Sequence, residues 1–296
     1  MLTSYPNFQS IQINHKAEIE EAISQFEPYS DFNFVSMFSW DVDNSVQICE
    51  LNGNLILKLP DYLTNKPIYS IIGTNKLDES INILLRDVGQ IGLVPEKIVQ
   101  EINTNNDLII TEDRDNYDYV YDINKLVTFE GKEFAKERNY LHKFQKLYGH
   151  SLGIDVFSKP LSNYADEIYT VLELWAKSQE RNDEDAKNEN TAIKRAIQHS
   201  DELNLSGFIL NIDNQPKGFA IYEFLNNDWS ISHFEKADST IERIFLFIKH
   251  QSMYYMQKNG STFANYEQDL GIEGLRQAKL GYHPARFLKK YTIKKH

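Results

Sequence analysis

The order of predicted strands and helices repeats once along the chain, and this repeat constrains the fold more than any other feature of the sequence. Alternating apolar residues predict strands, apolar residues three and four positions apart predict helices, and Gly, Asn and Pro mark the turns. By these patterns each half of the 296 residues has the order β-α-α-β-β-β-α-β-α-β. We therefore expect an α+β protein with mixed sheets and two tandem domains of one fold.

The clearest local signal in the first half is the pair Asn52-Gly53, which lies between apolar runs at residues 46–51 and 55–59. An Asn-Gly pair in this position predicts a tight hairpin because both residues tolerate a positive φ. The other elements of this half are expected as strands at 8–13, 67–72, 91–93 and 108–111, and as helices at 15–26, 32–40, 77–88 and from Pro95 onward.

The second half is expected to repeat this order after a helix at residues 131–148 that joins the domains. We therefore place the domains at residues 1–130 and 131–296. Strands are expected at 154–157, 207–211, 217–225, 229–234, 263–266 and 287–293, and helices at 164–177, 191–199, 241–256 and 271–280. The polar, acidic segment 179–190 predicts a loop.

The joining helix carries a basic stripe. Its polar residues Lys132, Lys136, Asn139, Lys143 and Lys146 are spaced 4, 3, 4 and 3 apart, which places them on one helix face. Such a stripe suits a polyanion, for example the acceptor arm of a tRNA. A solvated helix face is the alternative interpretation.

Charge and composition limit the partners and the compartment. The net charge of −12 weighs against a surface that binds nucleic acid or anionic lipid over its whole area, yet residues 276–296 carry basic and no acidic side chains. The sequence lacks the run of roughly 20 apolar residues that spans a membrane, and its N-terminus lacks a signal-peptide pattern. Together with a single cysteine, Cys49, this predicts a soluble protein of the reducing cytoplasm.

A short segment near the end of the chain concentrates side chains that bind anions or amines. Glu267, Asp269, Arg276 and Lys279 fall within thirteen positions, around two glycines that open a helix. The free N–H groups of a helix start favour negative charge, and two cations three residues apart share one face. The pattern predicts a phosphate or carboxylate site, and an ordinary helix capped by Asp269 is the alternative.

Two blocks of the sequence resemble a known family. The run Gly271-x-x-Gly274-Leu275-Arg276-x-x-Lys279-x-x-Tyr282-x-Pro284 resembles the signature that closes the catalytic domain of bacterial phosphatidylglycerol lysyltransferases and their soluble relatives. Gly131-Lys132, Arg138-Asn139, Lys143 and Tyr148-Gly149 are similar to that family's Gly…Arg-x-x-x-Asn-Arg…Gly helix, except that Asn139 directly follows Arg138.

The resemblance implies a fold, a donor and a set of substrate-binding residues. The fold would be two tandem N-acetyltransferase-like (GNAT-like) domains, as in N-acetyltransferases and Fem-type peptidyl transferases. The donor would be aminoacyl-tRNA or another phosphate-bearing molecule. The substrate-binding residues would be Arg138, Asn139, Lys143, Glu267, Asp269, Arg276 and Lys279, and we expect the two basic blocks to line one cleft.

Catalytic candidates come from the strand at 229–234 and its continuation. Strict alternation places His233 and Glu235 on the same side of this strand. In N-acetyltransferase-type folds a carboxylate here often acts as general base and a tyrosine beyond the next strand as acid, which by analogy selects Glu235 and Tyr282, with His233 beside them. The alternative is a Glu235 paired on the surface and a His233 satisfied in the core.

The loop after this strand bears on the acyl donor. Enzymes of this fold that use acetyl-CoA bind its pyrophosphate on a glycine-bearing loop, whereas residues 235–241 contain no glycine. Acyl-CoA is therefore disfavoured as co-substrate. Motifs for a metal site, a P-loop, a dinucleotide fold or a serine nucleophile elbow do not occur either.

These observations predict a transferase that moves an aminoacyl or acyl group onto a hydroxyl or amine. The acceptor, a small molecule or a lipid, is left open, and a membrane-anchored form is not expected. Two alternatives remain: an acyl-CoA-dependent N-acyltransferase, and a non-catalytic module that binds an anionic partner through its basic residues.

Overall fold

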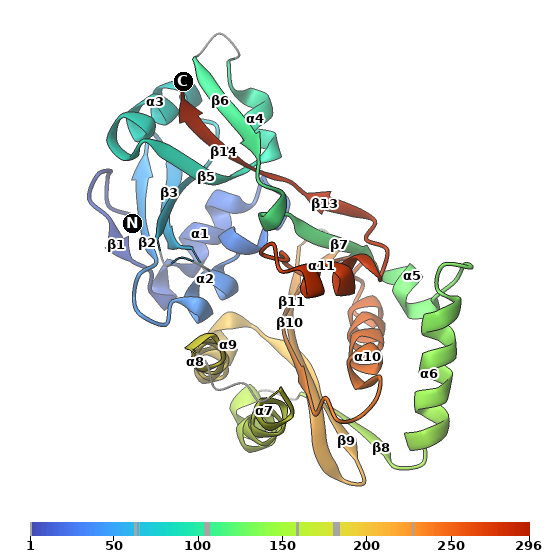
Figure 1. Ribbon diagram of the computed structural model, residues 1–296. Helices are drawn as coiled ribbons and strands as arrows, with labels where there is room; N and C mark the ends of the chain where they lie inside the picture. Colours follow the sequence, from blue (N-terminus) through green and yellow to red (C-terminus); the bar gives the residue numbers. More distant parts are fainter. Residues whose placement is uncertain are drawn as a thin grey trace. The chain divides into compact units, whose positions relative to one another are not determined.

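The chain forms two compact units, each built from helices and sheets (Figure 1). The computed structural model describes residues 2–61, 64, 66–103, 107–157, 160–179, 184–226 and 228–296. Unit 1 comprises Met1–Tyr119, Glu267–Lys279 and Arg286–His296, and unit 2 comprises Val120–Tyr266 and Leu280–Ala285. The α+β class expected from the sequence is confirmed.

Unit 1 follows the expected order of strands and helices. Its strands are β1 (Gln9–Ser10), β2 (Gln47–Leu51), β3 (Asn54–Pro60), β4 (Pro67–Ile72), β5 (Gln90–Pro95), β6 (Leu108–Glu112), β13 (Arg286–Leu288) and β14 (Lys290–Lys295). Its helices are α1 (Lys16–Ile23), α2 (Phe34–Trp40), α3 (Leu77–Val88), α4 (Glu96–Glu101) and α11 (Glu273–Leu280), the last residue of which is assigned to unit 2. Short 3₁₀ turns lie at η1 (Ile13–His15), η2 (Ser30–Phe32) and η3 (Arg114–Asn116).

The hairpin predicted at Asn52-Gly53 is confirmed. Asn52 has a φ of 55° and Gly53 a φ of 78°, the pair of positive values that a type I′ turn requires. This turn joins β2 to β3 in an antiparallel sheet of order β1-β2-β3-β4. The side chains of Ile56 and Leu57 on β3 are fully buried, so this hairpin forms part of the core of unit 1.

The last strand of the chain completes the second sheet of unit 1. β14 lies between β5 and β6 and pairs with both in antiparallel register, from Lys290 opposite Pro95 to Lys295 opposite Leu108. The sequence predicted a strand at 287–293 in the second domain. The strand exists as β14, and it makes its hydrogen bonds with β5 and β6 in unit 1.

Unit 2 is built around one mixed sheet. Its strands are the end of β7 (Asp118–Asp122), β8 (Leu152–Val156), β9 (Ser206–Ile212), β10 (Gln215–Leu225), β11 (Trp229–Ala237) and β12 (Phe263–Asn265), in the order β7-β12-β11-β10-β9-β8. Its helices are α5 (Ile123–Thr128), α6 (Ala135–Tyr148), α7 (Ala165–Gln179), α8 (Glu184–Gln198), α9 (Ser200–Leu203) and α10 (Ile244–Lys258), and a 3₁₀ turn lies at η4 (Leu161–Tyr164).

Helices cover both faces of this sheet. α7 packs on β10 and β11 from one side, and α10 packs on the same strands from the other, with α6 behind it (Figure 1). The rings of Phe144 on α6 and Phe247 on α10 stack with centroids 4.7 Å apart, which fixes α6 to the layer below. Lys136, Asn139, Lys143 and Lys146 on α6 are exposed.

Two boundaries differ from the sequence prediction. Residues 184–190 were expected in a loop but begin α8, and residues 180–183 of that expected loop lie outside the described residues. Ala186, Ile193 and Ile197 are buried at helical spacing, and Glu189 between them pairs with Lys236 at 2.6 Å. The domain division at residue 131 stays a prediction, whereas the compact units divide first between Tyr119 and Val120.

A buried ion cluster fixes β14 within unit 1. The ammonium of Lys290 pairs with Asp31 and lies 2.7 Å from Asp118, and none of the three side chains is more than 2% exposed. Burial alone would lower the pKa of Lys290, but the charges of Asp118 and Asp31 outweigh it and raise this pKa. Burial raises the pKa of Asp31 to about 6, since one cation serves two carboxylates.

We predict that Lys290→Met destabilises the protein by about 3–5 kcal/mol, because removal of one partner leaves buried carboxylates without a cation. The neighbouring Lys289→Met is the matched control. Lys289 is 39% exposed and pairs with Glu96 and Glu112 at the surface, so its loss should cost less than about 1 kcal/mol. Urea denaturation of both variants measures the difference, and equal losses would contradict a structural role for the buried cluster.

Candidate active site

The candidate active site of unit 2 lies where two neighbouring parallel strands part. β11 pairs with β12 from Trp229 opposite Phe263 to Ile231 opposite Asn265. β12 ends there, whereas β11 continues to Ala237. Side chains beyond the paired region, at the carboxyl ends of parallel strands, occupy the position at which open α/β sheets bind their ligands.

A β-bulge occurs in β11 next to this point. Ile221 on β10 lies opposite Phe234 and Tyr222 lies opposite Ser232, so His233 is an extra residue in β11. A bulge breaks the alternation of side chains between the two faces of a sheet. The faces of β11 before and after His233 must therefore be assigned from contacts rather than from spacing.

His233 and Glu235 lie on opposite faces of the sheet. His233 Nε2 lies 3.3 Å from Glu223 Oε1 in a buried pair. Ala220 lies opposite Glu235, and Glu223, three residues further along β10, points to the other face. The prediction that His233 and Glu235 share one side is wrong because the bulge at His233 shifts the alternation of side chains by one residue. Of these two residues, only Glu235 contacts Lys249 and Tyr266 on the α10 face.

Glu235 is held on the α10 face by several donors. Its Oε1 accepts hydrogen bonds from the Tyr266 hydroxyl at 2.9 Å and the Ser252 hydroxyl at 3.1 Å. Its Oε2 lies 3.5 Å from the ammonium of Lys249, and the Glu235 and Lys249 side chains are 14% and 13% exposed. Glu235 is therefore neither an isolated surface carboxylate nor fully enclosed.

Tyrosine rings surround the same group. The Lys249 ammonium lies 3.4 Å from the ring centre of Tyr266, 5.2 Å from that of Tyr282 and 5.7 Å from that of Tyr121. Burial and the charge of Glu235 raise the pKa values of both Tyr266 and Tyr282. The sequence-predicted pair Glu235 and Tyr282 is thus found in one cluster, with Tyr282 half-buried.

Sequence reasoning missed Tyr266 and Lys249. Tyr266 directly follows β12, and Lys249 belongs to the most apolar helix of the chain. Lys249 and Ser252 are three residues apart and therefore share a face of α10. Two polar residues on the covered face of an apolar helix were the signal in the sequence that could have identified this site.

In the loop between β11 and α10, hydrogen-bond donors already bind a carboxylate of the chain itself, that of Asp238. Asp238 is 8% exposed, and its Oδ1 accepts hydrogen bonds from the backbone N–H and the hydroxyl of Thr240, at 3.1 and 2.5 Å. Lys217 lies 3.5 Å from its other oxygen. Donors of this loop are therefore already engaged by an internal anion.

The basic residues of α6 have different environments. Arg138 donates to the carbonyl oxygens of Phe129 and Gly131, at 2.7 Å for the latter, and so fastens the turn before α6. Asn139 and Lys143 are exposed, as are Lys136 and Lys146. Lys132 precedes the helix, so it does not continue the stripe as predicted.

In unit 1 the residues of the glycine-rich signature contact one another. The guanidinium of Arg276 binds both carboxylate oxygens of Asp269, at 3.0 and 2.7 Å, and reaches Asp115 at 2.6 Å. Arg114 and the hydroxyl of Tyr119 also donate to Asp269, which is fully buried. Burial would raise the pKa of Asp269, but hydrogen bonds from Arg276, Tyr119 and the Gly271 N–H outweigh it and lower this pKa to about 2.

These contacts hold a turn of unusual backbone conformation. Glu267, Leu270 and Gly271 have φ values of 57°, 53° and 71°. Lys279 donates to the carbonyl oxygen of Gln268 at 2.6 Å and so binds the same turn. Because Arg276 and Lys279 belong to unit 1 and Arg138 and Lys143 to unit 2, the predicted common cleft stays a prediction.

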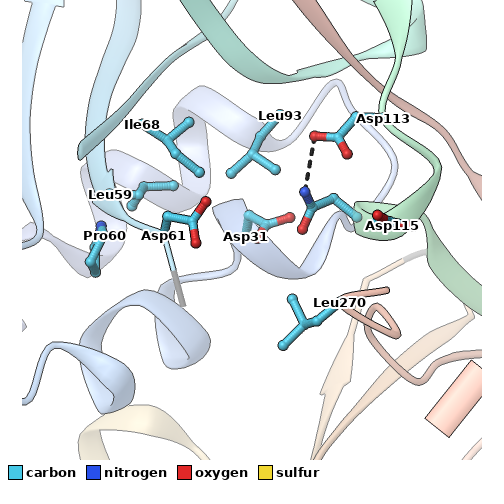
Figure 2. A pocket seen from close by; sticks show the side chains of 10 residues that line it. Asp31, Leu59, Pro60, Asp61, Ile68, Leu93, Asp113, Asp115 and Leu270 are labelled. Carbon is cyan, nitrogen blue, oxygen red and sulfur yellow. Dashed lines mark hydrogen bonds between the residues drawn. The ribbon is translucent and has the colours of Figure 1, made fainter. Parts of the chain in front are cut away.

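An acidic cavity of about 260 Å³ lies near this turn in unit 1 (Figure 2). Its polar wall contains Asp31, Asp61, Asp113 and Asp115, and its apolar wall includes Leu93. Figure 2 shows the carboxylates of Asp31 and Asp61 beside Leu59, Ile68 and Leu93. Such walls suit a cation with an apolar stem better than the anion expected from the spacing of Arg276 and Lys279.

We predict that Asp269→Asn destabilises the protein by about 2 kcal/mol at pH 7, as the lowered pKa requires. This stabilisation is fully present above the ordinary pKa of an aspartate, so the difference in stability between the two proteins should begin to shrink below about pH 4 and nearly vanish near pH 2. Denaturant unfolding at several pH values measures the convergence. Asp115→Asn is the control, because it alters a 61% exposed partner of the same arginine. It should lower the free energy of unfolding by less than Asp269→Asn at pH 7. A stability difference between wild type and Asp269→Asn that does not change with pH would contradict this account.

Comparison with known proteins identifies relatives of the whole chain. Residues 94–294 match the family described as phosphatidylglycerol lysyltransferase, C-terminal. A conserved protein of unknown function from Bacteroides thetaiotaomicron has 24% sequence identity and a TM-score of 0.85, and each chain is covered over 100% of its length.

Two further solved structures share the fold at lower identity. The C-terminal domain of a protein assigned as a lysylphosphatidylglycerol synthetase from Agrobacterium fabrum has a TM-score of 0.65 and 13% identity, with 96% of this chain and 92% of that chain covered. L-PGS from Bacillus licheniformis has a TM-score of 0.61 and 12% identity, with 100% and 94% covered. These structures support the expected α+β fold with mixed sheets, whereas the description of both units as GNAT-like domains stays a prediction.

Proposed function

Since the chain belongs to the phosphatidylglycerol lysyltransferase C-terminal family, we propose that it is a transferase that moves an activated aminoacyl group onto a hydroxyl or amine acceptor. The observation that carries this proposal is the cluster of Glu235, Lys249, Tyr266 and Tyr282 at the separated ends of β11 and β12. The cluster combines a carboxylate with protonated hydroxyls in a largely buried setting, as acyl transfer between two oxygen or nitrogen atoms requires.

The proposed reaction uses Glu235 and Tyr282 as base and acid. The acceptor oxygen or nitrogen attacks the carbonyl carbon of the aminoacyl ester, and the bond from that carbon to the ribose oxygen of the donor breaks. Glu235 takes the proton that the acceptor loses. Burial raises the pKa of Tyr282 and keeps its hydroxyl protonated, so Tyr282 can supply a proton to the departing oxygen.

Aminoacyl-tRNA is the donor that we propose. Its ester is already activated, so positioning and charge stabilisation suffice for transfer. The exposed Lys136, Lys143 and Lys146 on α6 offer contacts for its phosphates. Asp238 supports this choice over acyl-CoA, because a carboxylate already binds Thr240 in the loop that would have to accept pyrophosphate.

The acceptor is proposed as a class, a molecule with a free hydroxyl or amine. Among the helices that the structure describes, none is both long and apolar enough to cross a lipid bilayer. A small molecule and a lipid headgroup both satisfy the chemistry. We place the reaction in the cytoplasm, where aminoacyl-tRNA is formed.

We predict that Glu235→Gln lowers turnover by roughly 10²–10⁴-fold and leaves donor affinity nearly unchanged, as expected for loss of a general base. The measurement follows release of free tRNA or thiol from a panel of aminoacyl-tRNAs and acyl-CoAs. Glu242→Gln, which alters a 79% exposed carboxylate before α10, is the control and should keep full turnover. Full turnover of Glu235→Gln on a confirmed substrate would remove Glu235 from the mechanism, and release of thiol alone would select an acyl-CoA donor.

We predict that Lys143→Ala weakens tRNA binding and lowers the slope of log K against log salt concentration by about 1, because one phosphate contact is lost. Binding is measured by filter retention at several salt concentrations. Lys76→Ala serves as the control, since this side chain is 68% exposed in unit 1, and it should leave the slope unchanged. Equal effects of the two changes would argue against α6 as the tRNA-binding face.

If tRNA binds but no transfer occurs on any donor, the chain is a binding module rather than an enzyme. In that case Glu235→Gln should leave the complex intact, whereas Lys279→Ala should weaken it in a salt-dependent way.

A further inference from the structure

Lys249 occupies an unusual position for a lysine. It lies in the second turn of α10, and its ammonium contacts Glu235 at 3.5 Å and the ring face of Tyr266 at 3.4 Å from the centroid. The neighbouring residues Leu246, Phe247, Ile248 and Met253 are buried and apolar. A lysine at such a position costs free energy unless its charge is matched.

The environment of Lys249 supplies that match from two kinds of group. Glu235 provides the opposite charge, and the π-faces of Tyr266, Tyr282 and Tyr121 attract a cation through their quadrupoles. Burial nevertheless lowers the pKa of Lys249, and the charge of Glu235 only partly offsets this. Lys249 and Glu235 are therefore energetically dependent on one another.

The partners of Glu235 divide between its two oxygens. The neutral hydroxyls of Tyr266 and Ser252 donate to Oε1, whereas Lys249 faces Oε2. Donors on different oxygens fix the rotation of a carboxylate about its last bond, which a single ion pair would leave free. The removal of Lys249 would leave Oε1 bound and Oε2 without its cation.

We propose that Lys249 is a positioning residue, whose ammonium keeps the Glu235 carboxylate charged and correctly oriented to take a proton from the acceptor. This inference rests on the proposed function of Glu235 as the base. Lys249 acts through Glu235, since it contacts the carboxylate and the tyrosine rings.

Other titratable groups around the pair must be considered. Tyr266 and Ser252 bind Glu235 directly, Tyr121 comes from β7, and Tyr282 comes from the segment after α11. Glu137 on α6 and Arg243 before α10 act on Tyr282 from further away. Of these groups Arg243 is the other cation, and its guanidinium stacks 3.8 Å from the ring centre of Tyr140, so it does not replace Lys249 at Oε2.

The test replaces Lys249 with Met, which keeps an unbranched side chain of similar length and removes its charge, and with Arg, which keeps the charge. The carboxyl resonance of Glu235 is followed by ¹³C NMR during a pH titration, after assignment with Glu235→Gln. We expect Glu235 in Lys249→Met to take up its proton roughly one to three pH units higher than in the wild type, because a buried carboxylate has lost an opposite charge. Lys249→Arg should restore most of this shift, and Lys258→Met, at the exposed end of α10, should not change it.

The same variants are assayed for transfer from aminoacyl-tRNA. In Lys249→Met the acid limb of kcat/KM should move to higher pH by the same amount as the NMR midpoint, and KM for the donor should stay constant. An unchanged Glu235 titration in folded Lys249→Met overturns the inference, even if Glu235→Gln confirms the base. A shifted titration without any transfer activity supports the electrostatic role of Lys249 and refutes the proposed function instead.

If Lys249→Met does not fold, an NMR titration of the wild-type protein tests the inference instead. The ¹³Cε resonance of Lys249, assigned with Lys249→Arg, must then report the protonation of Glu235 with the same midpoint, because the two charges lie in contact. A Lys249 resonance that is insensitive to the protonation of Glu235 overturns the inference.

Discussion

The backbone pairing of β14 with β5 and β6 is the constraint on which the architecture of this chain depends. The central strand of the second sheet in unit 1 comes from the last residues of the sequence, so unit 1 is complete only with residues that follow most of unit 2 in the chain. The antiparallel ladder supplies partners for the backbone on both edges of β14. Lys290 adds a charge constraint, since its ammonium is buried against two carboxylates that belong to η2 and β7.

A second buried charge pair, Glu235 and Lys249, lies in unit 2, where we propose a role in chemistry rather than in architecture. In unit 1 the cations Lys290 and Arg276 are bound by fully buried carboxylates of the chain itself. In unit 2 the pair Glu235 and Lys249 is buried less completely and lies beside a half-buried tyrosine. A charge pair that keeps partial access to solvent at the ends of parallel strands is the arrangement expected of a site, and perturbed groups gather there for that reason.

The glycine-rich signature makes internal contacts that its spacing did not suggest. The two cations three residues apart predicted an open anion cradle, yet Arg276 binds Asp269 and Asp115, and Lys279 binds a backbone carbonyl group. These contacts hold a turn in which Glu267, Leu270 and Gly271 have positive φ values. The segment thus fixes a strained turn beside the acidic cavity, while its part in substrate binding stays a prediction.

The sequence by itself determined the α+β class, the repeated order of elements, the Asn52-Gly53 hairpin and two members of the candidate site, because periodicity, turn chemistry and a family signature are local properties of the chain. Only the tertiary structure decided that the last strand belongs to unit 1, because strand pairing is a long-range choice that local pattern does not encode. It also decided that His233 and Glu235 face opposite ways, since an unpredicted bulge shifts the alternation by one residue. Only the tertiary structure identified Tyr266 and Lys249 as members of the candidate site. Both contact Glu235 from other elements of the fold, and spacing along the sequence does not encode such contacts.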